Sequence, residues 1–322
     1  MRMLVAILAL ASSAALAQPS AEETLSAVVG VSSKVPAGAR SAATLGTERR
    51  GSGALIREQY VLTIGYLVME AAAVEVTSSE GRTVPATVAA FDQVSGFGLL
   101  KLAAPLGGTP LALGDSAAVS ENEPAMVISA PGREGASIVR VVSRRAFSGG
   151  WEYMLDSAIF THPAVPEWSG APLIGPRGEL LGIGSLIVAD ADGQGGAQTP
   201  GNMFVPIDLL KPILSDLIAS GRRRGPARPW LGVNTDELRG HLFVARVSPG
   251  GPAERAGLRA DDIVLAVAGD EVHTLAELYS KIWSRGAAGV DVPLRVLRGA
   301  QVRNVTVRSI DRAQYFKGST AY

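Results

Sequence analysis

Short apolar runs separated by turn residues fill residues 25–210, and this pattern limits the possible folds more than any other feature of the chain. Regularly spaced short strands of this kind are typical of an all-β barrel or sandwich. The predicted strands cover 28–31, 54–56, 61–63, 74–76, 84–90, 99–102, 125–129, 139–143 and 180–187. Apolar residues make up 47% of the chain and charged residues 19%, which suits a well-packed protein.

A second unit is predicted towards the C-terminal end of the chain, since 322 residues are enough for two domains. A helix is predicted over 209–219, and the segment 221–229, rich in arginine, glycine and proline, has the composition of a linker. We favour a solvated hinge for this segment; the alternative is an arginine-rich binding patch. Residues 230–310 resemble a small α+β domain, with a helix at 275–283 and strands at 242–247, 263–268, 292–297 and 305–307.

The first 17 residues have the order of a secretory signal peptide. Arg2 supplies a positive start, residues 4–11 an apolar core, and Ala15-Leu16-Ala17 a cleavage site. The alternative is an uncleaved membrane anchor, but the apolar run is shorter than the roughly 20 residues that a spanning helix needs. We therefore expect an exported protein that keeps no membrane-spanning segment after cleavage.

Charge and residue content exclude several classes of function. The formal net charge is zero, so nothing indicates a nucleic-acid partner or attraction to anionic lipid. The absence of cysteine excludes thiol catalysis and thiolate metal sites. The three histidines, His162, His241 and His273, have no clustered carboxylates beside them, so we expect neither a catalytic metal nor another cofactor.

Several motifs in residues 25–220 occur together in a known order. They are Gly51-Ser52-Gly53 before Val61-Leu62-Thr63, Leu113-Gly114-Asp115-Ser116, the run from Pro166 to Leu173, and Phe204-Val205-Pro206. This region resembles the protease domain of the HtrA/Deg serine proteases. The resemblance implies a trypsin-like double β-barrel, and with it a mainly β protein.

The resemblance also implies a catalytic triad, of which two members are replaced in this chain. Tyr66 stands at the histidine position of the family pattern Leu-Thr-x-x-His-Val-Val, and Gly96 stands at the aspartate position. Ser169 keeps the nucleophile position. Glu167 replaces the family glycine whose backbone N–H helps to form the oxyanion hole.

These replacements predict a loss of catalysis. A serine hydroxyl needs an adjacent base to become a nucleophile, and a phenol with a pKa of about 10 does not act as one near neutral pH. Losing the base costs about six orders of magnitude in rate in a comparable enzyme. We interpret Ser169 as a vestigial nucleophile kept as a small turn residue beside Gly170. The alternative is an active serine endopeptidase with an unconventional base, for which His162 and Lys101 are the candidates.

Residues 230–310 resemble a PDZ domain of the HtrA type. The resemblance rests on Trp230-Leu231-Gly232-Val233 and on the run from Val247 to Leu258, Val-Ser-Pro-Gly-Gly-Pro-Ala-Glu-Arg-Ala-Gly-Leu. It implies that the backbone N–H groups of Leu231, Gly232 and Val233 hold a terminal carboxylate while a peptide pairs with the adjacent strand. Apolar residues of the predicted helix would line the pocket for the last side chain, or else form ordinary core: Leu275, Leu278 and Ile282.

The sequence therefore predicts an exported, periplasmic HtrA-like protein, catalytically inactive, that binds unfolded or C-terminal peptide segments in envelope protein quality control. Polypeptides are the expected partners, bound in the PDZ groove. A homo-oligomer, a trimer by family resemblance, is a further expectation. A third hypothesis gives both domains a purely structural role in oligomerisation.

Overall fold

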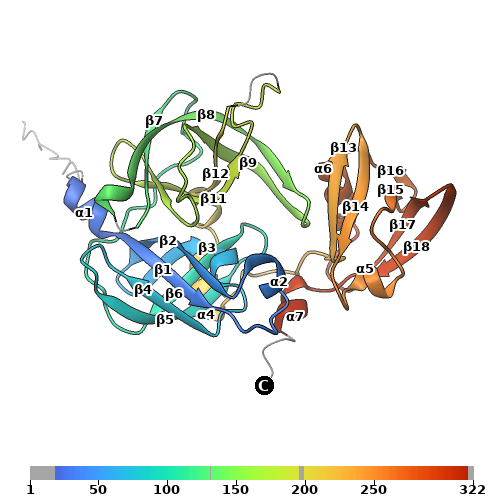
Figure 1. Cartoon of the computed structure of the whole chain (residues 1–322), viewed down its shortest axis with the longest axis horizontal. Coiled ribbons are helices and arrows are strands. Elements are labelled where there is room, and N and C mark those ends of the chain that lie inside the picture. The colour runs from blue at the N-terminus through green and yellow to red at the C-terminus, as the bar shows by residue number, and fades with distance from the viewer. Residues whose placement is uncertain (1–18, 131, 196–198, 318–322) are drawn as a thin grey trace, which may run out of the picture.

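The computed structural model describes residues 19–130, 132–195 and 199–317. Two closed six-stranded barrels are followed by a smaller sheet domain (Figure 1). The predicted fold class, a double β-barrel with a small α+β domain after it, is confirmed. The predicted signal peptide lies outside the described residues. Within them, no helix is both long and apolar enough to cross a membrane.

The first barrel closes in the order β1-β2-β3-β6-β5-β4. Every strand predicted between residues 28 and 102 lies inside one of these six, because short apolar runs bounded by turn residues favour strands. Their bounds are β1 (Val28–Lys34), β2 (Glu48–Arg57), β3 (Tyr60–Ile64), β4 (Ala73–Thr77), β5 (Thr83–Phe91) and β6 (Phe97–Leu102). Three short helices accompany this barrel: α1 (Ala21–Ser26), α2 (Ala42–Leu45) and α3 (Gly65–Val68).

The second barrel closes in the order β10-β11-β12-β9-β8-β7. Its elements are β7 (Pro124–Ile128), η1 (Arg133–Gly135), β8 (Ala136–Gly149), β9 (Tyr153–His162), β10 (Pro172–Ile174), β11 (Leu180–Val188) and β12 (Gly201–Pro206). The ends of β8 and β9 continue past the barrel as a hairpin that extends toward the third domain (Figure 1). The sequence predicts only the middle of β8 and no strand over β9, so this hairpin is not foreseen.

The helix predicted over 209–219 is shorter than expected. The structure has a 3₁₀ turn, η2 (Ile207–Leu209), and then α4 (Leu214–Ser220). Pro212 explains the difference, since proline disfavours helical geometry in the residue before it and has no N–H to donate.

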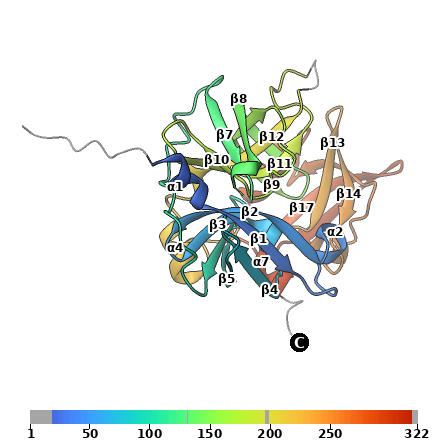
Figure 2. The ribbon, with the colours of Figure 1, turned by 60° about the vertical axis from the view of Figure 1, so that its left-hand side comes forward.

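The third domain contains a sheet in the order β13-β14-β15-β17-β18, with β16 paired to β15. The predicted helix 275–283 is confirmed as α6 (Leu275–Trp283). The other elements of this domain are β13 (Val233–Leu238), β14 (His241–Val247), α5 (Pro252–Arg255), β15 (Ile263–Val267), β16 (Asp270–Glu271), β17 (Asp291–Arg298) and β18 (Gln301–Arg308). The last helix, α7 (Arg312–Lys317), returns to the first barrel (Figure 2). There the Arg40 guanidinium lies 3.9 Å from the centre of the Tyr315 ring.

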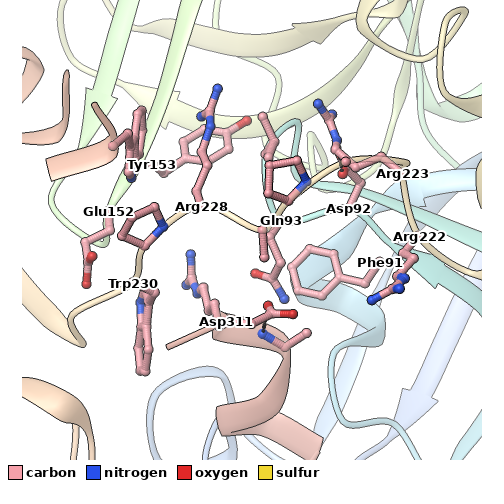
Figure 3. Close-up of a pocket in the computed structure, with 18 of the residues that line it drawn as sticks. Phe91, Asp92, Gln93, Glu152, Tyr153, Arg222, Arg223, Arg228, Trp230 and Asp311 are labelled. Carbon is pink, nitrogen blue, oxygen red and sulfur yellow. Dashed lines mark hydrogen bonds and ion pairs between the residues drawn. The ribbon is translucent and has the colours of Figure 1, made fainter. Parts of the chain in front are cut away.

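The linker 221–229 is exposed along most of its length but is anchored to its surroundings by specific contacts. Arg223 donates two hydrogen bonds to the buried Asp92 carboxylate, at 2.7 and 2.6 Å (Figure 3). Near the other end, the Arg228 guanidinium lies 4.2 Å from the centre of the Trp283 ring. The arginines therefore attach the linker to both domains, which neither a freely solvated hinge nor a free binding patch would do.

Candidate functional site

Ser169 lies in a turn that backbone contacts hold against the first barrel. Its carbonyl accepts a hydrogen bond from the N–H of Ser52 in β2, at 2.8 Å. Gly170 has a φ of +72°, and a Cβ at this position would lie 2.5 Å from the Thr63 hydroxyl and still closer to the Ser52 carbonyl oxygen. Only glycine fits there. The Ser-Gly turn thus has a packing role that does not depend on catalysis.

The Ser169 hydroxyl donates a hydrogen bond to the Tyr66 phenol, with 2.9 Å between Oγ and Oη. Tyr66 lies on α3, at the end of β3, so the phenol occupies the position from which a base would act on the serine. The phenol in turn donates to the Ser185 carbonyl, at 3.0 Å. Burial raises the pKa of Tyr66 to about 12. The phenol therefore stays protonated near neutral pH and does not take the serine proton.

Gly96 lies between β5 and β6 with a φ of +84°, in a conformation that favours glycine. A Cβ at this position would lie 3.1 Å from the Tyr153 hydroxyl. That hydroxyl is buried and donates to the Ser95 carbonyl at 2.6 Å. Tyr153, from β9, therefore fills the space that a side chain at position 96 would need.

The alternative bases lie elsewhere. His162 is exposed at the end of β9, with Nδ1 2.7 Å from the Pro200 carbonyl oxygen. Lys101 is exposed on β6, opposite Tyr60. Neither lines the cleft beside Ser169. Glu167, which stands where the family has a glycine, is also exposed. The predicted effect of this replacement on the oxyanion hole stays an expectation.

A cleft of about 550 Å³ opens beside Ser169 and reaches the third domain. Tyr66, Trp168 and Ser169 line it from the barrels, and Asn234 and Arg246 line it from the sheet of the third domain. The indole N–H of Trp168 donates to the Ser185 carbonyl at 3.3 Å, the same oxygen to which Tyr66 donates. The cleft beside Ser169 is thus open, and residues of the barrels and of the third domain form its walls.

The loop Leu231-Gly232-Val233 is built to hold an anion. Gly232 has a φ of +82°, which turns three successive backbone N–H groups to one side. The loop is fixed from behind: the Leu231 carbonyl accepts from the N–H of Ala253 at 2.8 Å, and the Gly232 carbonyl from that of Ser248 at 2.7 Å. This geometry agrees with the carboxylate-binding role that the resemblance implies.

The Glu152 side chain occupies this loop. Its Oε2 accepts from the N–H of Leu231 at 2.9 Å, and its Oε1 accepts from those of Gly232 and Val233 at 2.7 and 3.0 Å. Glu152 comes from the tip of the β8–β9 hairpin and is buried, with 6% of its surface exposed (Figure 3). The three N–H groups therefore already hold a carboxylate, supplied by the second barrel.

The three helix residues that the sequence offers as groove or core all lie in the core of the third domain. Their exposed fractions are 7% for Leu275, 1% for Leu278 and 0% for Ile282. Met154 of β9 packs against the same apolar cluster. Peptide contacts by these helix residues stay a proposal.

Sequence reasoning missed Glu152, Tyr153 and the anchoring of Arg223. Each acts on a partner more than 50 positions away, and no spacing in the sequence connects the partners. The only local sign is Gly149-Gly150, which is typical of a hairpin turn but says nothing about what the turn contacts.

Comparisons with known proteins agree with both halves of the fold. Residues 51–183 match the family described as trypsin-like peptidase domain, and residues 229–308 match the PDZ domain family. HhoA of Synechocystis sp., named as a serine protease, is 30% identical over 81% of this chain and 70% of its own length. The serine protease Do-like HtrA of Bacillus subtilis is 26% identical over 78% of this chain and 61% of its own length.

Solved structures support the same fold. The HtrA-type protease AlgW, solved with a tripeptide, superimposes with a TM-score of 0.53 at 23% identity, covering 91% of this chain and 97% of that one. Together with the sequence matches, this shows that the chain belongs to the HtrA family of trypsin-like serine proteases that carry a PDZ domain.

Proposed function

We propose that this chain is an exported HtrA-family protein without endopeptidase activity, which binds unfolded or C-terminal polypeptide segments in protein quality control of the cell envelope. Relatives support the periplasmic location: DegQ of Escherichia coli and DegP of Salmonella typhimurium are named as periplasmic serine endoproteases. The chain spans about 60% of the length of each of these two relatives.

One observation carries the inactivity: the Ser169 hydroxyl donates its hydrogen bond to a buried phenol, 2.9 Å away, that stays protonated near neutral pH and does not take the serine proton. Nucleophilic attack needs that proton to leave the hydroxyl as the new bond forms. Gly96 supplies no carboxylate to orient a base, and even a Cβ at this position would lie 3.1 Å from the Tyr153 hydroxyl. A serine in this setting is a hydrogen-bond donor rather than a nucleophile.

Peptide binding is supported by the Leu231-Gly232-Val233 loop. Its three converging N–H groups suit a terminal carboxylate, and β13 directly follows the loop and offers backbone groups to an extended peptide. The open cleft beside Ser169 gives further surface for a polypeptide.

A fluorophosphonate probe tests the inactivity. Wild type and Ser169→Ala should both stay unlabelled and leave casein intact, while an active serine endopeptidase assayed alongside is labelled. Labelling of the wild type that disappears in Ser169→Ala, together with casein cleavage, would instead establish the alternative of an active endopeptidase.

A trimer, expected from the family resemblance alone, is part of the same proposal. Sedimentation equilibrium of the purified protein measures it directly. A trimer that binds no peptide in any assay would favour the purely structural role over peptide binding.

A further inference from the structure

The contact between the β8–β9 hairpin and the third domain has the form of a ligand in a PDZ groove. Beyond the three N–H groups that hold Glu152, the Gly150 carbonyl accepts from the N–H of Thr235 in β13, at 2.8 Å. The hairpin tip therefore pairs its backbone with the strand next to the carboxylate loop, as an added peptide strand would.

The opposite wall of the groove also holds the hairpin. The Tyr279 hydroxyl of α6 donates to the Gly149 carbonyl at 2.7 Å and accepts from the Glu152 N–H at 3.2 Å. The Tyr279 side chain is fully buried by these contacts. The hairpin thus lies between β13 and α6, the two elements that a peptide would contact.

The sequence of the tip fits this position closely. A Cβ at Gly150 would lie 2.5 Å from the Thr235 carbonyl oxygen, so only glycine allows the backbones to approach this far. Glu152 has a φ of +57°, an uncommon conformation for a residue with a side chain, which surrounding contacts must stabilise. Arg312 of α7 adds a hydrogen bond to the Trp151 carbonyl, at 3.3 Å.

We propose that the β8–β9 hairpin is an internal ligand of the PDZ domain: the Glu152 carboxylate takes the place of a peptide's terminal carboxylate, and an external peptide binds only after the hairpin tip leaves the groove. The inference rests on the proposed peptide-binding function, because it describes how that site is regulated. It gives the chain a closed state, which this structure shows, and an open state that competent peptides would select.

The closed state is tested without any peptide, by hydrogen exchange of the full-length protein. Glu152→Ala removes the carboxylate, and Gly150→Val keeps the glutamate in the sequence but pushes the hairpin tip away from Thr235 and out of the groove. Both variants should exchange the amides of Leu231, Gly232 and Val233 at least tenfold faster than wild type. The matched control is Glu134→Gln, an exposed glutamate near the other end of β8, which should exchange like wild type.

Exchange in β3 of the same samples shows whether the barrels stay folded. Equal exchange of residues 231–233 in wild type and in the folded variants would refute the internal ligand. If both variants unfolded, exchange of residues 148–154 in the wild type under saturating peptide would decide: faster exchange supports displacement of the hairpin, and unchanged exchange contradicts it.

Binding of a random decapeptide pool with free C-termini, compared with the same pool amidated, completes the test. Glu152→Ala should bind the free-carboxylate pool at least tenfold more tightly than wild type, and the amidated pool no better than wild type does. Equal affinity in wild type and Glu152→Ala would overturn the regulation but leave the peptide-binding function standing. If the amides of residues 231–233 exchange faster in Glu152→Ala but no variant binds any peptide, the peptide-binding function is refuted and the internal ligand is still supported.

Discussion

At the scale of single residues, the two positions that the family resemblance assigns to the histidine and the aspartate both lie against hydrogen-bonded aromatic side chains. The Tyr66 hydroxyl accepts a hydrogen bond from the Ser169 hydroxyl, and the Tyr153 side chain packs beside Gly96. We therefore expect that a single substitution at position 66 or 96 does not create the geometry of a catalytic triad.

Tyr66→His should therefore fail to create an efficient protease. An imidazole without its aspartate works roughly four orders of magnitude more slowly than a complete triad. Adding Gly96→Asp should not recover the loss, because a side chain at a φ of +84° is strained and meets the Tyr153 hydroxyl. Hydrolysis of fluorogenic casein measures this, with Ser169→Ala in each background as the baseline. Activity of the double variant equal to that of an active family member would contradict the argument.

At the scale of elements, the turn that carries Ser169 contacts β2, β3 and β11 at once. Its carbonyls and N–H groups bond Ser52 of β2 and Gly184 of β11. A turn held this way has a packing role whether or not the serine is catalytic, because removing it would disturb the contact between the barrels.

Gly170→Ala should lower the free energy of unfolding by about 2–4 kcal/mol, because it adds a collision with β2 to the cost of a positive φ. Gly107→Ala is the matched control, since Gly107 has a similar φ of +89° and open space around it. It should cost only about 1 kcal/mol. Urea unfolding of both variants separates the collision from the backbone strain. Equal losses would show that the turn is not tightly packed.

The linker is a second element with a specific role. Asp92 is buried, with 3% of its surface exposed, and Arg223 forms two hydrogen bonds to it. Arg223→Ala should therefore destabilise the first barrel by about 1–3 kcal/mol, because it leaves a buried carboxylate without its cation. Urea unfolding measures this. Arg222→Ala, at an exposed neighbour, should change the stability by less than about 0.5 kcal/mol, and a loss as large as that of Arg223→Ala would contradict a specific anchor.

At the scale of the whole molecule, the hairpin tip joins the two functional regions. The same short segment presents Glu152 to the PDZ loop and Tyr153 to the Ser95 carbonyl, beside Gly96. Movement of the tip out of the groove would therefore also disturb the packing of Tyr153 on the Ser169 side of the barrels. The Glu152 carboxylate thus holds the domains together alongside the Tyr279 contacts, the linker and α7.

Domain docking should weaken as the pH rises. Burial raises the pKa of Glu152 from 4.5 to about 7 and outweighs the opposing effects of the Leu231, Val233 and Gly232 N–H groups and of Arg312. The other titratable group that faces Glu152 is Tyr279. A carboxyl with a raised pKa in the docked state contributes fully to docking below pH 4.5, and the contribution is lost as the pH rises through about 7.

The radius of gyration from small-angle scattering should therefore increase between pH 5.5 and pH 8.5 in the wild type. Glu152→Ala should show an expanded radius that does not change with pH over this interval. A wild-type radius that is constant, or that falls as the pH rises, would contradict the assignment of the pH dependence to Glu152.

Local patterns in the sequence were enough for most of the fold. The six strands of the first barrel follow from short apolar runs and the turn residues between them, and α6 follows from its helical spacing. β13 was missed because its run from Asn234 to Glu237 is polar, and the helix at 209–219 was overextended because Pro212 interrupts it. Recognition of Tyr66, Gly96 and Ser169 as related positions required the resemblance to a family.

Local patterns predict the class of fold, and together with the family resemblance they predict that two triad residues are replaced, because strand spacing and motif order are local properties of the chain. The contact between Tyr66 and Ser169, and the identity of the group that holds the PDZ loop, come from the tertiary structure alone. Glu152 reaches Gly232 across 80 positions, and Tyr66 reaches Ser169 across 103. Such contacts depend on how the two barrels and the third domain pack, and packing sums many weak contacts that no short pattern encodes.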